Sequence, residues 1–184
     1  QIRDLNPDTP DAAIIKSIIG KDSDVVTITF DAKTAIFKFD NTTIICCLVV
    51  GNYPKYRTII PQNNSNILRI NRLQLLNTVR RIAVCSPKGS NHIKFDLAPG
   101  SLEISAQDLG FEIAAHEKIS CQYDGCELSI GFKSTHIIEM LSNLSCEEIV
   151  MKFADKRRSA LLQPSEEEVK SERVFGIVMP IMVK

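Results

Sequence analysis

The sequence predicts an α+β fold in which one βαβββ repeat recurs along the chain. Three segments carry the hydrophobic spacing of amphipathic helices and begin near residues 10, 72 and 134, an interval of 62 residues each time. Each segment is followed by three runs with the alternation and turn residues of β-strands. A repeat of this kind must pair with another copy to bury its apolar face. We therefore expect one full domain, with two helices packed on antiparallel sheets, and half of another.

The three expected helices share an apolar face and differ in their ends. The first begins after Thr9, a capping residue, and Pro10, which suits the first helical position, and it stops at Gly20. The second starts at about Asn71 and the third at Ser134. In each helix, aliphatic side chains recur every three to four residues: Ile14, Ile15, Ile18 and Ile19; Leu75, Leu76, Val79 and Ile82; Ile137, Ile138, Leu141 and Leu144.

The expected strands follow the same order in each repeat. They cover residues 25–30, 34–39 and 42–50, then 93–97, 102–106 and 111–119, then 148–153, 159–162 and 174–182. Short strands at 67–70 and 127–132 precede the second and third helices. The polar run at 62–66 is expected to link two domains, residues 1–62 and 63–184. Pro180 cannot donate to a ladder, so it must lie at a sheet edge or beyond the last strand.

Composition and charge exclude several classes of protein. The chain has 184 residues, 44% hydrophobic and 24% charged, which excludes disordered, collagen-like and coiled-coil proteins. Its 22 Lys and Arg balance its 22 Asp and Glu, so any contact with nucleic acid must be local or topological. No stretch is apolar enough to suggest a membrane span. Because the chain does not start with Met, we expect a fragment of a cytoplasmic protein.

No motif for catalysis, a metal or a cofactor stands out. Cys46 and Cys47 are adjacent, so a strand would point them to opposite faces, and Cys121 and Cys126 are spaced as around a turn. We therefore expect free thiols in a reducing compartment, with no metal. The Lys-Gly-Ser at 88–90 lacks the upstream glycine of a phosphate-binding loop. An enzyme is not expected, and the alternative of a thiol or metal-dependent enzyme requires bound zinc or a reactive cysteine.

The C-terminal segment is apolar where a free tail is usually polar. It reads Phe175-Gly-Ile-Val-Met-Pro-Ile-Met-Val-Lys184. Met179, Ile181 and Met182 either form an adaptable surface for a partner peptide or close the core of their own domain. The sequence alone supports both interpretations equally.

Three motifs together point to one known family. Gly51-Asn-Tyr-Pro-Lys-Tyr-Arg-Thr-Ile-Ile-Pro61 resembles the segment that joins the second and third domains of the bacterial sliding clamp, the β subunit of DNA polymerase III. Ile130-Gly-Phe-Lys-Ser134 resembles a strand-to-helix entry, and Ile177-Val-Met-Pro-Ile181 is similar to the family's C-terminal ending. The resemblance implies a DNA-clamp fold with six βαβββ repeats per full chain. Residues 1–62 would then be the C-terminal half of clamp domain 2, and residues 63–184 would be clamp domain 3.

The resemblance also implies three surfaces. A peptide-binding surface would comprise Pro54, Ile59, His136, Arg157, Ser159, Ile177, Met179, Pro180, Ile181 and Met182. The DNA-facing residues would be Arg80, Arg81, Lys16 and Lys133, although each of these is as readily a solvated charge. The dimer edge would include Val84 and Cys85 after the second helix, and Leu102 and Ile104 on a strand. His136 stands where the family often has Tyr, and Arg157 stands where it often has a small apolar residue.

The function implied is that of a non-catalytic processivity factor in DNA replication. The resemblance implies short linear motifs of the polymerase III catalytic subunit, the clamp loader, translesion polymerases and repair proteins as partners. It also implies a homodimeric ring around duplex DNA when the chain is full length, a cytoplasmic, nucleoid-associated location and no membrane partner. The alternative is a stand-alone protein-interaction scaffold that does not encircle DNA.

Overall fold

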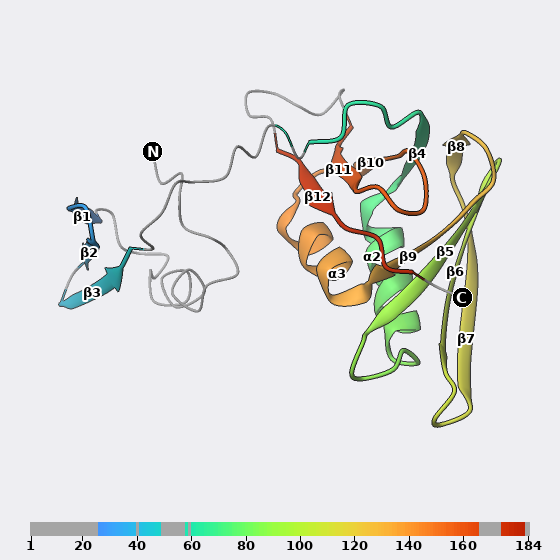
Figure 1. Ribbon diagram of the computed structural model, residues 1–184, viewed down its shortest axis with the longest axis horizontal. Helices are drawn as coiled ribbons and strands as arrows, with labels where there is room; N and C mark the ends of the chain where they lie inside the picture. The colour runs from blue at the N-terminus through green and yellow to red at the C-terminus, as the bar shows by residue number, and fades with distance from the viewer. Residues whose placement is uncertain (1–25, 40, 49–57, 59, 166–173, 183–184) are drawn as a thin grey trace. The chain divides into compact units, whose positions relative to one another are not determined.

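The computed structural model divides the chain into two compact units, residues 1–54 and residues 55–184 (Figure 1). It describes residues 26–39, 41–48, 58, 60–165 and 174–182. The first expected helix, which ends at Gly20, lies outside the described residues.

The division between the units precedes the polar run at 62–66 that the sequence marks as a linker. Asn64 and Asn66 explain the difference, because their side-chain amides attach this run to the second unit. Asn64 Nδ2 donates to the carbonyls of Lys152 (2.8 Å) and Ser159 (3.2 Å). Asn66 Nδ2 donates to the carbonyl of Ala154 (3.0 Å). The run at 62–66 is therefore hydrogen-bonded to residues 152–159 of the second unit.

The described part of the first unit is a three-stranded antiparallel meander. Its strands are β1 (Thr27–Phe30), β2 (Thr34–Phe39) and β3 (Thr42–Cys47), in that order across the sheet. A small apolar cluster of Ala35, Phe37 and Cys46 lies on one face. Cys46 is buried and Cys47 is exposed, which confirms that the two thiols point to opposite faces.

The second unit contains two βαβββ repeats. The first repeat consists of β4 (Asn66–Asn71), α2 (Arg72–Ala83), β5 (His92–Ala98), β6 (Ser101–Asp108) and β7 (Ile113–Ser120). The second consists of β9 (Leu128–Lys133), α3 (Ser134–Asn143), β10 (Glu148–Phe153), β11 (Ala160–Pro164) and β12 (Gly176–Val178). The order of elements confirms the repeat that the sequence predicts. A short strand that the sequence did not predict, β8 (Gln122–Asp124), lies between the repeats.

Each repeat contributes its first strand to the sheet of the other. The five-stranded sheet has the order β12-β11-β10-β4-β8, and the four-stranded sheet has the order β7-β6-β5-β9. Thus β4 of the first repeat pairs antiparallel with β10, and β9 of the second repeat pairs antiparallel with β5. Because of this exchange, neither repeat can bury its apolar face without the other.

In the second unit, both helices and both sheets contribute side chains to one hydrophobic core. Figure 1 shows α2 and α3 side by side in this unit. Helix α2 begins at the N-cap Asn71, whose side chain accepts a hydrogen bond from the backbone N–H of Gln74 (3.0 Å). Helices α2 and α3 pack on each other and turn their aliphatic faces inward. Neither of these helices, the two that the described residues contain, is long and apolar enough to cross a membrane.

Candidate functional site

The end of the chain leaves the five-stranded sheet beside the turn between β10 and β11. Val178, the last residue of β12, pairs with Ala160, the first residue of β11. Ser159 and Met179 therefore lie at the same end of this strand pair. Pro180 follows β12 outside the ladder, as its missing N–H requires.

Strand β12 and the chain that follows it are held at two points, one on α3 and one on β9. A Cβ built on Gly176 would lie 2.5 Å from Cε of Met140, so the Met140 side chain packs directly on the backbone of β12. Further on, the N–H of Ile181 donates to the carbonyl of Gly131 (2.8 Å), which precedes α3. The segment thus passes from the last turns of α3 toward its start. His136 is exposed and lies one helical turn before Met140, on the same face of α3.

These contacts leave two methionine side chains in solvent. Met179 is 64% exposed and Met182 is 73% exposed. Val178, the residue before Met179, is only 2% exposed and belongs to the core. We call the residues around them the C-terminal surface: His136, Ser159, Ile177, Met179, Pro180, Ile181 and Met182. The segment therefore closes its own core through Val178 and also presents an apolar surface.

The remaining residues of the predicted peptide-binding surface lie elsewhere or cannot be placed. Arg157 is exposed on the turn between β10 and β11, next to the C-terminal surface in the chain. Pro54 and Ile59 lie outside the described residues.

The two arginines predicted to face DNA lie exposed on α2, but both already have partners. Arg80 Nη2 donates to the Ser142 hydroxyl on α3 (3.2 Å). Arg81 forms an ion pair with Glu117 of β7, with 2.6 Å between Nη2 and Oε1. Thr78 is buried beside this pair and donates from its hydroxyl to the same carboxylate oxygen (2.9 Å). A phosphate would have to compete with Glu117 for Arg81.

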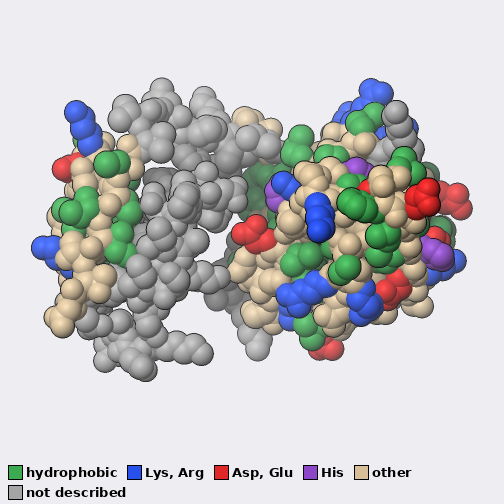
Figure 2. Space-filling model, turned by 90° about the horizontal axis from the view of Figure 1, so that it is seen from below, with side chains coloured by type: hydrophobic (Ala, Val, Ile, Leu, Met, Phe, Trp, Pro, Cys, Tyr) green, Lys and Arg blue, Asp and Glu red, His purple; other side chains and the backbone are tan. Residues whose placement is uncertain are grey.

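The remaining two residues predicted to face DNA are lysines, and they do not extend the exposed positive charge of α2. Lys133 is half-buried at the end of β9, and Lys16 lies outside the described residues. Figure 2 shows Lys and Arg interspersed with Asp, Glu and hydrophobic side chains on the face of the second unit that it presents. That face carries no extended field of one sign, in keeping with the net charge of zero.

We expect the ion pair of Arg81 and Glu117 to make stability depend on acid pH. The hydrogen bond from Arg81 lowers the pKa of Glu117 below its ordinary value of 4.5, and the Thr78 hydroxyl lowers it further. A lowered carboxyl pKa stabilises the fold above the ordinary value and loses that contribution as pH falls through the folded-state pKa. In urea titrations, Glu117→Gln should therefore lower the midpoint at pH 7, and the difference from the parent chain should disappear as the pH falls below 4.5 and through the folded-state pKa of Glu117. A difference that persists unchanged at low pH would show that the charge of Glu117 is not involved.

The structure corrects half of the predicted dimer edge. Val84 is 83% exposed after α2, and Cys85 is half-buried beside it. Leu102 and Ile104, in contrast, are fully buried, and their strand β6 lies between β7 and β5. An interior strand offers no free backbone groups and these side chains belong to the core, so the assignment of Leu102 and Ile104 to an edge was wrong. The outer strands of this sheet are β7 and β9.

A cavity of about 490 Å³ lies away from the C-terminal surface, along the pair of β4 and β8. Cys121 and Tyr123 line it, and burial raises the pKa of both side chains. The Cys121 thiol is therefore less nucleophilic than an ordinary cysteine. Among the described residues, no three His, Cys, Asp or Glu side chains gather in a cluster that could hold a metal ion.

Two features beside the C-terminal surface were not singled out from the sequence. Met140 packs on Gly176 of β12, a contact that only the tertiary structure reveals. Lys156 and Arg158 flank Arg157, and three consecutive cations next to Ser159 were a signal visible in the sequence.

Comparison with known proteins gives a consistent result. Residues 57–181 match the family model described as DNA polymerase III beta subunit, C-terminal domain. The beta sliding clamp of Haemophilus influenzae is 29% identical over 127 residues, which cover 69% of this chain and 34% of that relative. The beta sliding clamp of Pseudomonas putida is 31% identical over 134 residues, 73% of this chain and 35% of that relative. This chain therefore spans about a third of the length of these curated relatives.

A solved structure supports the same fold. A sliding clamp from Bartonella birtlesii superposes with a TM-score of 0.81 at 22% identity, covering 94% of this chain and 45% of that one. The α+β architecture of two helices on antiparallel sheets is thus the DNA-clamp fold that the sequence predicted. With a family model that covers well over half of its residues, this chain belongs to the family of the DNA polymerase III beta subunit, the sliding clamp.

Proposed function

We propose that this chain is part of a sliding clamp that acts as a processivity factor in DNA replication. Membership of the clamp family favours this function over a stand-alone interaction scaffold. In the full-length protein, two chains close into a ring around duplex DNA, and the ring contact includes Val84 and Cys85. Residues 1–62 correspond to half of clamp domain 2 and residues 63–184 to clamp domain 3. The protein is a non-catalytic accessory subunit that works in the cytoplasm, at the nucleoid.

The C-terminal surface is the proposed docking site for replication proteins. The observation that carries this proposal is the exposure of Met179 and Met182 on a segment whose backbone is anchored by Ile181 and by Val178. Flexible thioether side chains suit partners with varied aliphatic and aromatic residues. The Ser159 hydroxyl lies at the same end and offers a hydrogen bond. Short linear motifs of the polymerase III catalytic subunit, the clamp loader, translesion polymerases and repair proteins bind here.

Peptide titration tests this proposal. A fluorescent peptide of the type Gln-Leu-x-Leu-Phe should bind the chain saturably, as followed by fluorescence anisotropy. Met179→Ala should weaken binding about tenfold, because truncating a central apolar anchor costs more than about 1 kcal/mol. Leu109→Ala is the matched control, since Leu109 is 79% exposed in the loop between β6 and β7.

The control variant distinguishes binding at a specific site from nonspecific binding to exposed apolar side chains. If Leu109→Ala weakens binding as much as Met179→Ala, the peptide binds exposed apolar side chains without a defined site. Failure of the peptide to bind at millimolar concentration would rule out the C-terminal surface as the docking site.

A further inference from the structure

The turn between β10 and β11 carries an uncommon concentration of positive charge. Lys156, Arg157 and Arg158 are consecutive and exposed, and with the single carboxylate of Asp155 they leave a net charge of +2 on residues 155–158. Arg158 Nε lies 3.4 Å from Asp155 Oδ2. Within the described part of the chain, neither Lys156 nor Arg157 forms an ion pair with any residue. Two cations are thus available to a ligand.

Hydrogen bonds with the side chains of Asp155, Asn64 and Asn66 fix the backbone of this turn. Asp155 Oδ1 accepts hydrogen bonds from the backbone N–H groups of Arg157 (2.7 Å) and Arg158 (3.0 Å). These two bonds are the main reason that the pKa of Asp155 lies below its ordinary value, because they favour the ionised carboxylate that accepts them. Asn64 and Asn66 hold both ends of the turn through the carbonyls described above. A ligand that binds here does not need to order the backbone first.

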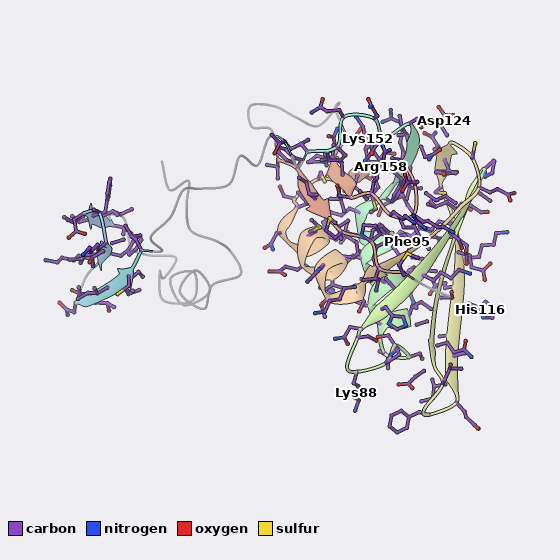
Figure 3. All side chains as sticks on the ribbon, in the orientation of Figure 1. Lys88, Phe95, His116, Asp124, Lys152 and Arg158 are labelled. Carbon is purple, nitrogen blue, oxygen red and sulfur yellow. The ribbon has the colours of Figure 1, made fainter. Side chains whose placement is uncertain are left out.

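The turn adjoins the C-terminal surface directly. Ser159 connects Arg158 to β11, and the pairing of Ala160 with Val178 brings this end of β11 to the point where Met179 leaves the sheet. Arg158 is labelled in Figure 3 at this turn, whereas the exposed Lys88 is labelled at the far end of the second unit. Charge and exposed thioethers are therefore neighbours at one end of the five-stranded sheet.

We propose that the C-terminal surface selects linear peptides that carry acidic residues beside their hydrophobic anchors, and that Lys156 and Arg157 bind those acidic side chains. This inference rests on the proposed docking function and adds the chemistry of the preferred partner. A peptide fits better than a nucleic acid because two exposed methionines adjoin the cations, and methionine gives no binding energy with a phosphate backbone. Guanidinium and ammonium groups pair well with carboxylates.

The expected effect is modest and salt-dependent. Exposed ion pairs contribute little individually, so two cations together should give about a five- to tenfold preference at low salt. Screening shortens the range of these interactions to about 3 Å at 1 M salt, so most of the preference should disappear there. Hydrophobic anchoring by Met179 does not depend on salt in this way.

Three peptides with one hydrophobic core provide the test. They share Gln-Leu-x-Leu-Phe and carry either two Glu, two Gln or two Lys next to it, and their affinities are measured by anisotropy at about 50 mM and 1 M salt. The Glu peptide should bind about five- to tenfold more tightly than the Gln peptide at low salt, and the Lys peptide more weakly than both. The Lys156→Gln, Arg157→Gln double variant should remove the preference. Lys88→Gln, an exposed lysine far from the turn, should keep it.

The outcomes distinguish this inference from the docking function on which it rests. If the Glu and Gln peptides bind equally well at low salt, and Met179→Ala weakens both, docking stands and acidic selection is wrong. If no peptide binds, both are wrong. If short duplex DNA displaces the Glu peptide and this effect disappears in the double variant, the turn binds phosphate and the inference is overturned.

Discussion

Replacing Phe132 with alanine is expected to destabilise the second compact unit by about 3–5 kcal/mol. Phe132 is fully buried on β9, with its ring edge-on to Phe95 at 5.4 Å between centroids and 6.3 Å from the ring of Phe153. The three rings come from β9, β5 and β10, and thus from both repeats. Removing the central ring leaves a cavity and also breaks both ring contacts.

Urea unfolding followed by far-UV circular dichroism measures this loss. Phe111→Ala is the matched control, because Phe111 is 72% exposed and its removal should change stability by less than about 0.5 kcal/mol. An unchanged unfolding midpoint for Phe132→Ala would mean that the two repeats do not share the core described here.

The second large effect is expected from Arg72→Ala. Arg72 begins α2, and its half-buried side chain reaches the end of α3. Its Nε donates to the carbonyl of Cys146 (2.7 Å) and its Nη1 donates to the carbonyl of Leu141 (3.0 Å). The last carbonyls of a helix lack partners within the helix, and a cation there is favourable. Removing both charged hydrogen bonds should cost about 2–4 kcal/mol of unfolding free energy.

Two further variants make this prediction specific. Arg72→Lys keeps the charge but cannot reach both carbonyls in the same fork geometry, so it should recover only part of the loss. Arg69→Ala removes an exposed arginine from the neighbouring strand β4 and should be nearly neutral. If Arg69→Ala and Arg72→Ala have the same effect on the urea midpoint, the contacts of Arg72 with α3 do not contribute.

Local patterns predicted most of the elements in the fold. Strands β2 and β10 occur at the predicted residues, and α2 and α3 begin within one residue of the predicted starts. Their signals are short-range: alternation, helical spacing and the capping residue Asn71. The exchange of β4 and β9 between sheets left no such signal, because the pairing of Ile70 with Ile149 depends on residues far apart in the chain. Strand β8 is too short for alternation to mark it.

The candidate site was less predictable for the same reason. Alternation shows that Leu102 and Ile104 point to the same face of a strand, but it does not show whether that strand lies at an edge. The helical spacing placed Arg81 on the polar face of α2, but its partner Glu117 is 36 residues away on β7. Val178 and Met179 are adjacent and both apolar, so their residue types could not show that Val178 is buried in the core while Met179 is exposed.

The position of β4 in its sheet has a mechanical consequence. The second compact unit starts at residue 55, and its first strand is β4, which has antiparallel ladders to β10 on one side and to β8 on the other. Ladder hydrogen bonds run perpendicular to the strands, so tension along the axis of β4 loads them together in shear instead of opening them one at a time. Asn64 and Asn66 add side-chain bonds where that force would enter. The connection between the two compact units is therefore attached to a strand that resists extraction.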